Sequence, residues 1–136
     1  MIMRKLFLFC FAALLAVGLT ACGKKGGDSG CSETAMTIST IPAINTVDPP
    51  GVGPDFPVQV NITANLPAAG ATVTITAKPV SSSTAFYTET RTVTAANNTF
   101  NITNTPAATS CVVTISVTSK SCSNNKWTGT YNYSRK

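Results

Sequence analysis

The stretch "ATVTITAK", from Ala71 to Lys78, places apolar side chains on alternate residues and threonine or lysine on the residues between them. Successive side chains of a β-strand point to opposite faces, so a period of two gives a strand one apolar and one polar face, whereas an amphipathic helix repeats about every 3.6 residues. The stretch therefore predicts a β-strand with one buried face. Its threonines suit the opposite, solvated face because they are polar and β-branched.

The same alternation recurs on both sides of this stretch. Apolar and polar residues alternate from 56 to 64 and from 111 to 119, and the aromatic residues of segment 126–134 keep one phase. Shorter candidate strands are 36–40, with a continuation at 44–47, then 85–93 and 99–103. Clusters of Pro, Gly, Asn and Ser separate these segments and predict turns, and no segment of residues 34–136 has the period of a helix.

About seven short strands, each with one apolar face, predict a single all-β domain over residues 34–136, folded as an antiparallel two-sheet β-sandwich around one core. The order and spacing of the strands resemble an immunoglobulin-like or fibronectin-III-like module of the bacterial kind. Two features depart from the immunoglobulin pattern. No tryptophan marks the second or third strand, and Thr109 stands where immunoglobulin domains place a tyrosine. A small barrel or a jelly roll is the alternative fold.

The N-terminal residues predict export from the cytoplasm. Arg4 and Lys5 give a charged start, residues 6–19 are uncharged and mostly apolar, and two small residues lead to Cys22. This order is typical of a secretory signal peptide, here residues 1–21 and expected to be helical, and the apolar run is short for a membrane span of about 20 residues. The alternatives are an uncleaved anchor and an ordinary signal peptide with an incidental cysteine.

The sequence Leu19-Thr20-Ala21-Cys22 resembles the lipobox of bacterial lipoproteins at all four positions. The resemblance implies cleavage before Cys22, attachment of a diacylglycerol to its sulfur, and acylation of the freed N-terminus with a chain such as palmitate. Two or three acyl chains hold a protein stably on a membrane, which a single chain does not. Residues 22–33 are then expected to be a lipidated cysteine and a flexible, Gly-rich tether.

The lipobox resemblance predicts a location in the bacterial cell envelope, with the membrane as one partner. By resemblance to lipoprotein sorting signals, Gly23 rather than Asp after the cysteine favours the outer membrane of a Gram-negative cell. The acidic cluster that marks surface export in some phyla is absent, which favours the periplasmic face.

Three cysteines remain for the exported domain, because Cys10 leaves with the signal peptide and Cys22 is lipidated. An oxidising compartment allows Cys31, Cys111 and Cys122 one disulfide and one leftover thiol. In the expected sandwich the start of the first strand and the last turn lie at the same end, which favours a Cys31–Cys122 bridge. The alternative is Cys111–Cys122, although a straight strand of this length holds two such cysteines too far apart.

The composition excludes several kinds of chemistry. The chain has no histidine, so neither a Ser-His-Asp nor a Cys-His arrangement exists, and we expect no catalytic residue. The few carboxylates and the dispersed thiols lack the spacing of zinc or calcium sites, so we expect no metal and no cofactor. In "DPPGVGPD", Asp48 and Asp55 flank a segment whose prolines and glycines indicate a turn. No basic run is interleaved with aromatic residues, so we expect no nucleic-acid partner.

Three aromatic residues near the C-terminus, Trp127, Tyr131 and Tyr133, share one phase of the last predicted strand. They form either a strip on which sugar rings stack or part of the core. Two classes of function follow. The first is a lipid-anchored, non-catalytic structural or interaction module that binds an envelope protein through a sheet edge or loops. The second is a small carbohydrate- or peptidoglycan-binding module that uses the three aromatic residues.

Overall fold

The computed structural model describes residues 30–136, which contain seven β-strands and no helix. The strands are β1 (Thr37–Ile41), β2 (Phe56–Ala64), β3 (Ala71–Pro79), β4 (Tyr87–Val93), β5 (Asn97–Ile102), β6 (Thr109–Ser119) and β7 (Lys126–Arg135). The all-β prediction is confirmed, and every strand expected from the period of two, apart from the continuation at 44–47, is present, with its ends displaced by a few residues at most. The predicted signal-peptide helix, Cys22 and most of the predicted tether lie outside the described residues.

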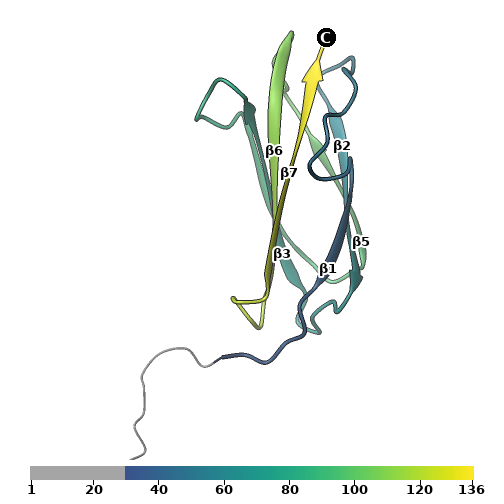
Figure 1. Cartoon of the computed structure of the whole chain (residues 1–136), viewed down its shortest axis with the longest axis vertical. Coiled ribbons are helices and arrows are strands. Elements are labelled where there is room, and N and C mark those ends of the chain that lie inside the picture. Colours follow the sequence, from purple (N-terminus) through teal and green to yellow (C-terminus); the bar gives the residue numbers. More distant parts are fainter. Residues whose placement is uncertain (1–29) are drawn as a thin grey trace, which may run out of the picture.

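The strands form two antiparallel sheets, as in a β-sandwich (Figure 1). One sheet has the order β1-β2-β5 and the other the order β4-β3-β6-β7. Strands β3 and β6 are central in the larger sheet and are paired along their whole lengths, with Ile75 opposite Ile115. Because strands run antiparallel, the turns fall into two groups at opposite ends of the molecule. Cys31 and the turns 64–71, 93–97 and 119–126 lie at one end, called here the Cys31 end. The segments 41–56, 79–87 and 102–109 and the C-terminus lie at the other, called the distal end.

The core consists of the apolar phase of each strand. Cys111, Val113, Ile115 and Val117 of β6 are all fully buried, as are the alternate residues of β3 from Ala71 to Ala77. The outward phase of the larger sheet is mostly threonine and serine, and its other residues are Lys78, Val112, Lys126 and Asn132. These side chains form rows across neighbouring strands. Thr74, for example, lies opposite Thr90 of β4 and Ser116 of β6, and its hydroxyl oxygen lies 3.1 Å from that of Thr90. The alternation in the sequence therefore places the inner and outer faces correctly.

The chain crosses from one sheet to the other directly after β1. The Ile41–Pro42 peptide bond is cis, and the segment that follows runs parallel to β7. Backbone hydrogen bonds join them, from Asn45 N to the Thr130 carbonyl at 2.7 Å and from Asp48 N to the Asn132 carbonyl at 2.8 Å. The predicted strand continuation at 44–47 is therefore wrong: residues 44–45 form a turn, and only Val47 makes a bridge, with Asn132 of the opposite sheet from β1. This crossing covers the C-terminal part of the free edge of β7 and connects the two sheets.

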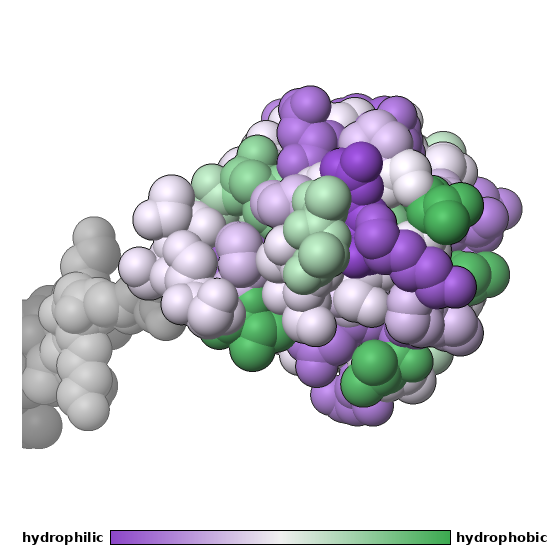
Figure 2. All heavy atoms as spheres, turned by 90° about the horizontal axis from the view of Figure 1, so that it is seen from above, coloured by the Kyte–Doolittle hydropathy of each residue, from purple (hydrophilic) through white to green (hydrophobic). Residues whose placement is uncertain are grey.

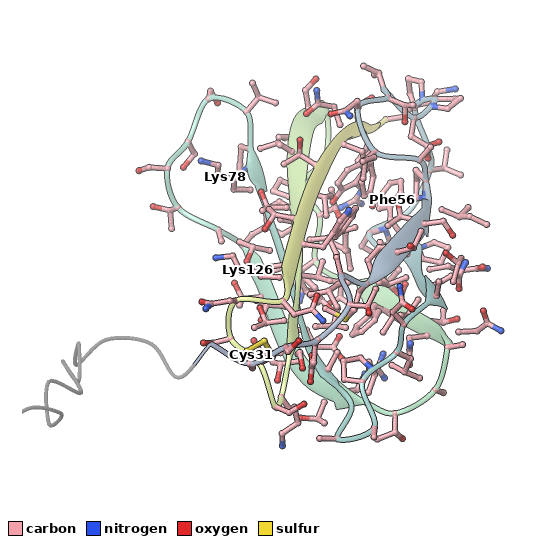
Figure 3. All side chains as sticks on the ribbon, turned by 60° about the horizontal axis from the view of Figure 1, so that its bottom comes forward. Cys31, Phe56, Lys78 and Lys126 are labelled. Carbon is pink, nitrogen blue, oxygen red and sulfur yellow. A yellow bond between two sulfur atoms is a disulfide. The ribbon has the colours of Figure 1, made fainter. Side chains whose placement is uncertain are left out.

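At the Cys31 end, the first described residues are fastened to the β6–β7 turn. Cys31 and Cys122 form a disulfide with a Cα–Cα distance of 5.4 Å, visible in Figure 3. Asn125, which is almost fully buried, accepts a hydrogen bond from Met36 N at 3.1 Å and donates one to Glu33 at 3.0 Å. Hydrogen bonds from Ser121, Asn125 and Ser119 hold the pKa of the Glu33 carboxyl below its usual value. The disulfide is the one favoured by the sequence, and it fixes where the preceding chain joins the sandwich.

Candidate functional site

A crevice opens at the distal end, between the segment that crosses from β1 to β7 and the start of β2. It has a volume of about 220 Å³. Its lining residues are Ile41, Pro42, Asp48, Phe56, Pro57, Tyr131 and Tyr133. We call this site the distal crevice. Six of its residues are apolar or aromatic, and Asp48 is the one charged residue.

The crossing segment forms one wall of the distal crevice because local features of its sequence turn it away from β1. Asn45 adopts a left-handed backbone conformation, with φ of 60°, where the segment meets β7. Gly51 lies directly over the Phe56 ring, and a Cβ atom at this position would be only 2.6 Å from Phe56 Cε1. Glycine therefore allows the segment to approach the ring closely. Phe56, labelled in Figure 3, lies far from Cys31 along the sandwich.

Three aromatic rings form the floor of the distal crevice. The ring centroids of Phe56 and Tyr133 are 4.5 Å apart, and those of Tyr131 and Tyr133 are 6.2 Å apart. The Tyr133 hydroxyl lies 2.8 Å from the hydroxyl of the buried Thr105. Burial raises the pKa of Tyr133 to about 12. Burial also raises the pKa of Tyr131, and the negative charges of Tyr133 and Asp48 raise it further. Both phenols are therefore uncharged at neutral pH.

The largest exposed apolar side chains of residues 30–136 all belong to the distal end. Ile41, Val47, Val52 and Val80 are 58, 75, 80 and 61% exposed. The first ends β1, the next two belong to the crossing segment and the loop after it, and the last follows β3. Figure 2 looks onto this end and shows apolar residues as separate islands among polar ones. The distal end thus combines a crevice with several exposed apolar contacts around it.

The three aromatic residues predicted as a possible sugar-stacking strip pack instead with the core. Tyr131 and Tyr133 are each only 2% exposed. Trp127 is half-buried against the core, and its indole lies over Gly129 together with Ile44, since a Cβ on Gly129 would be 2.6 Å from Trp127 Cη2. The structure therefore agrees with the core-packing interpretation of their shared phase. Two of the three still contribute to a site, as the floor of the distal crevice.

The other predictions from the sequence concern the third cysteine of the domain, the lipidation site, metal binding and membrane spanning. Cys111 is a free, fully buried cysteine, and burial raises the pKa of its thiol, so it is poorly reactive. The predicted lipidation site, Cys22, lies outside the described residues. Residues 30–136 contain no cluster of three or more potential metal ligands of the His, Cys, Asp and Glu types. That same part of the chain has no helix suited to crossing a bilayer.

Sequence reasoning did not identify Asp48 or Phe56 as site residues. The sequence pattern assigns Asp48 to a turn and Phe56 to the strand predicted over residues 56–64. The only available signal was the position of Asp48 between the segment 44–47, predicted as a strand, and two prolines. This position marks a chain leaving a strand, but it does not say which sheet that strand joins.

Searches of protein-family models, curated proteins and solved structures find no match to this chain. The chemistry of the distal crevice is therefore deduced from its own residues. It has no nucleophile, no paired acid and base, and no metal ligands beyond one carboxylate. Apolar and aromatic walls with a few polar groups are typical of binding pockets.

Proposed function

We propose that this protein is a lipid-anchored component of the bacterial cell envelope whose β-sandwich is a non-catalytic module that binds a protein partner through its distal end. The lipobox at Leu19-Thr20-Ala21-Cys22 supports the anchor, and Gly23 supports sorting to an outer membrane. The strand orders β1-β2-β5 and β4-β3-β6-β7 support a fibronectin-III-like module.

The observation that carries this proposal is the separation of the two ends. The described chain begins at Gly30 and is fastened to the sandwich by Cys31 and Cys122, while the distal crevice and the exposed apolar residues lie at the opposite end. An anchor on Cys22 would therefore hold the Cys31 end toward the membrane and present the distal end away from it. Apolar side chains exposed at such an end are suited to binding a partner.

A glycan-binding module built on Trp127, Tyr131 and Tyr133 has less support. Stacking on sugar rings needs open aromatic faces, and the two tyrosines are almost completely covered. Trp127 has one side against the core and lies toward the Cys31 end of β7, away from the distal crevice. The three residues do not form a continuous exposed strip.

The anchor is tested by the substitution Cys22→Ser in a Gram-negative host. The variant should leave the membrane fraction completely, because the acyl chains have no other attachment point, and it should keep the melting temperature of the wild type, because anchor and core share no residue. Fractionation after detergent-free lysis, followed by melting of the released protein, measures both. A variant that stays in the membrane pellet would show that residues 6–19 act as an uncleaved anchor.

The role of the distal end is tested by the double substitution Val47→Asp and Val52→Asp. Both side chains are exposed, so the fold should tolerate the change, but two new charges should abolish an apolar contact with a partner. In living cells of the native host, cross-linking should give a discrete higher-mass adduct for the wild type and none for this variant. The matched control, Thr90→Asp with Thr130→Asp on the outer sheet face, should keep the adduct. Equal adducts in both variants, or none for the wild type, would contradict the proposal.

A further inference from the structure

Asp48 lacks a partner for its charge. The single ion pair within 4.0 Å among residues 30–136 joins Arg91 to Glu89, at the far edge of the larger sheet. The backbone N–H of Asp48 donates to the Asn132 carbonyl, but no hydrogen bond or ion pair within these residues involves its side chain. Its carboxyl oxygens are not among the buried side-chain atoms that lack a hydrogen-bond partner, so they are reached by solvent. The carboxylate is therefore accessible to a basic group from outside the described chain.

The basic side chains at the distal end do not pair with the Asp48 carboxylate. The Arg135 guanidinium extends toward the 102–109 segment, where its Nη1 donates to the Thr105 carbonyl at 2.5 Å. Lys136 is exposed, and its backbone N–H donates to the Gly51 carbonyl. Lys78 lies near the end of β3, two strands away from β7 in the larger sheet, and it does not line the crevice. The distal crevice therefore has one acid and no base in its lining.

The shape and lining of the distal crevice complement one long basic side chain. Its volume of about 220 Å³ is suited to a single side chain rather than to a folded segment. The walls are apolar or aromatic, so the methylene groups of lysine or arginine could pack on them while the charged group reaches the rim. The Asp48 carboxylate is the one charged group of the lining, so it is the group that such a cation would meet.

We propose that the distal crevice binds a lysine or arginine side chain of the partner protein, with its apolar stem against Ile41 and Phe56 and its charged end on the Asp48 carboxylate. This proposal rests on the proposed role of the distal end as the partner-binding end. It adds the chemistry of the partner, which is a basic segment.

The three tyrosines of the chain allow a direct test. The full chain, labelled with carbon-13 tyrosine and held in a neutral detergent, should give ring signals for Tyr87, Tyr131 and Tyr133. Titration with N-acetyl-arginine methylamide should shift the Tyr131 and Tyr133 signals in a saturable way, with a millimolar dissociation constant, as expected for so small a ligand. Tyr87, on β4 and outside the crevice, should not move. N-acetyl-norleucine methylamide, which has an apolar stem and no charge, should give no saturation.

The substitution Asp48→Asn should weaken binding of the arginine probe at least tenfold, because the carboxylate supplies the only charge of the lining. Its fold should persist, since only the backbone of Asp48 is used in pairing with β7; an Asp48→Ser variant removes the charge with a smaller side chain. The matched control is Asp55→Asn, because Asp55 is exposed, follows in the same connection and does not line the crevice. This control should bind as the wild type does.

Several results would overturn the inference: no saturable shift with the arginine probe, equal shifts with the neutral probe, or wild-type affinity in both Asp48 variants. The proposed function would fail separately, if the wild type gave no cross-linked adduct, if the Val47→Asp, Val52→Asp variant kept it, or if the Cys22→Ser variant stayed in the membrane. A protein that forms the adduct but does not bind the probe would retain its role at the distal end. Its partner would then lack a basic anchor.

Discussion

Reduction of the Cys31–Cys122 disulfide is expected to lower the melting temperature of the protein by more than about 10 °C, from a loss of at most about 4–5 kcal/mol. The bridge spans 91 residues, nearly the whole domain, so it removes much of the conformational freedom of the unfolded chain. The loss is large against the roughly 5–15 kcal/mol that stabilises a typical domain. Asn125 and its hydrogen bonds to Met36 N and Glu33 still fasten the segment after reduction, so the measured loss should be smaller than the entropic figure.

Melting followed by circular dichroism, with and without reductant, measures this effect. A Cys31→Ser, Cys122→Ser variant is the control, because it should melt at the lower temperature and be insensitive to reductant. Cys111 should resist alkylation in the folded, oxidised protein and react only after unfolding, because it is fully buried. Peptide mapping under non-reducing conditions identifies the bridge directly. A cross-link that contains Cys111 would refute the pairing and cast doubt on the strand order.

Ile115→Ala is the second large effect, with an expected cost of about 2–5 kcal/mol. Ile115 is fully buried at the centre of β6, opposite Ile75 on β3 and opposite Gly129 on β7. Truncation removes buried apolar area and leaves a cavity. Urea unfolding of the variant and the wild type measures the difference in the free energy of unfolding.

Thr114→Ala provides the matched control from the neighbouring position. Thr114 belongs to the outward phase of β6, between Thr76 and Thr130, and is only half-buried. Its loss should cost less than about 1 kcal/mol, the scale of a cross-strand contact on a solvated face. Similar losses at positions 114 and 115 would show that the register of β6 has been assigned incorrectly.

Much of the fold could be predicted from the sequence because alternation along a strand is a local property. The residues from Ala71 to Lys78 specify a strand and its buried face whatever their partners are. The order of strands then implied that Cys31 and Cys122 lie at the same end. The shared phase of Tyr131 and Tyr133 likewise placed them on one face of β7.

Only the tertiary structure decided what these residues form together. Whether Tyr131 and Tyr133 face solvent or the core depends on Phe56, which stacks on Tyr133 from a strand more than seventy residues earlier in the chain. The position of Asp48 depends on the crossing of the chain from β1 to the edge of β7. Backbone groups make this pairing, and the periodicity of the side chains does not predict which backbone groups pair. Phase along a strand is set by neighbours in the chain, and it predicts faces. A crevice is made by residues distant in the sequence, and its charge and volume exist only once those residues have packed.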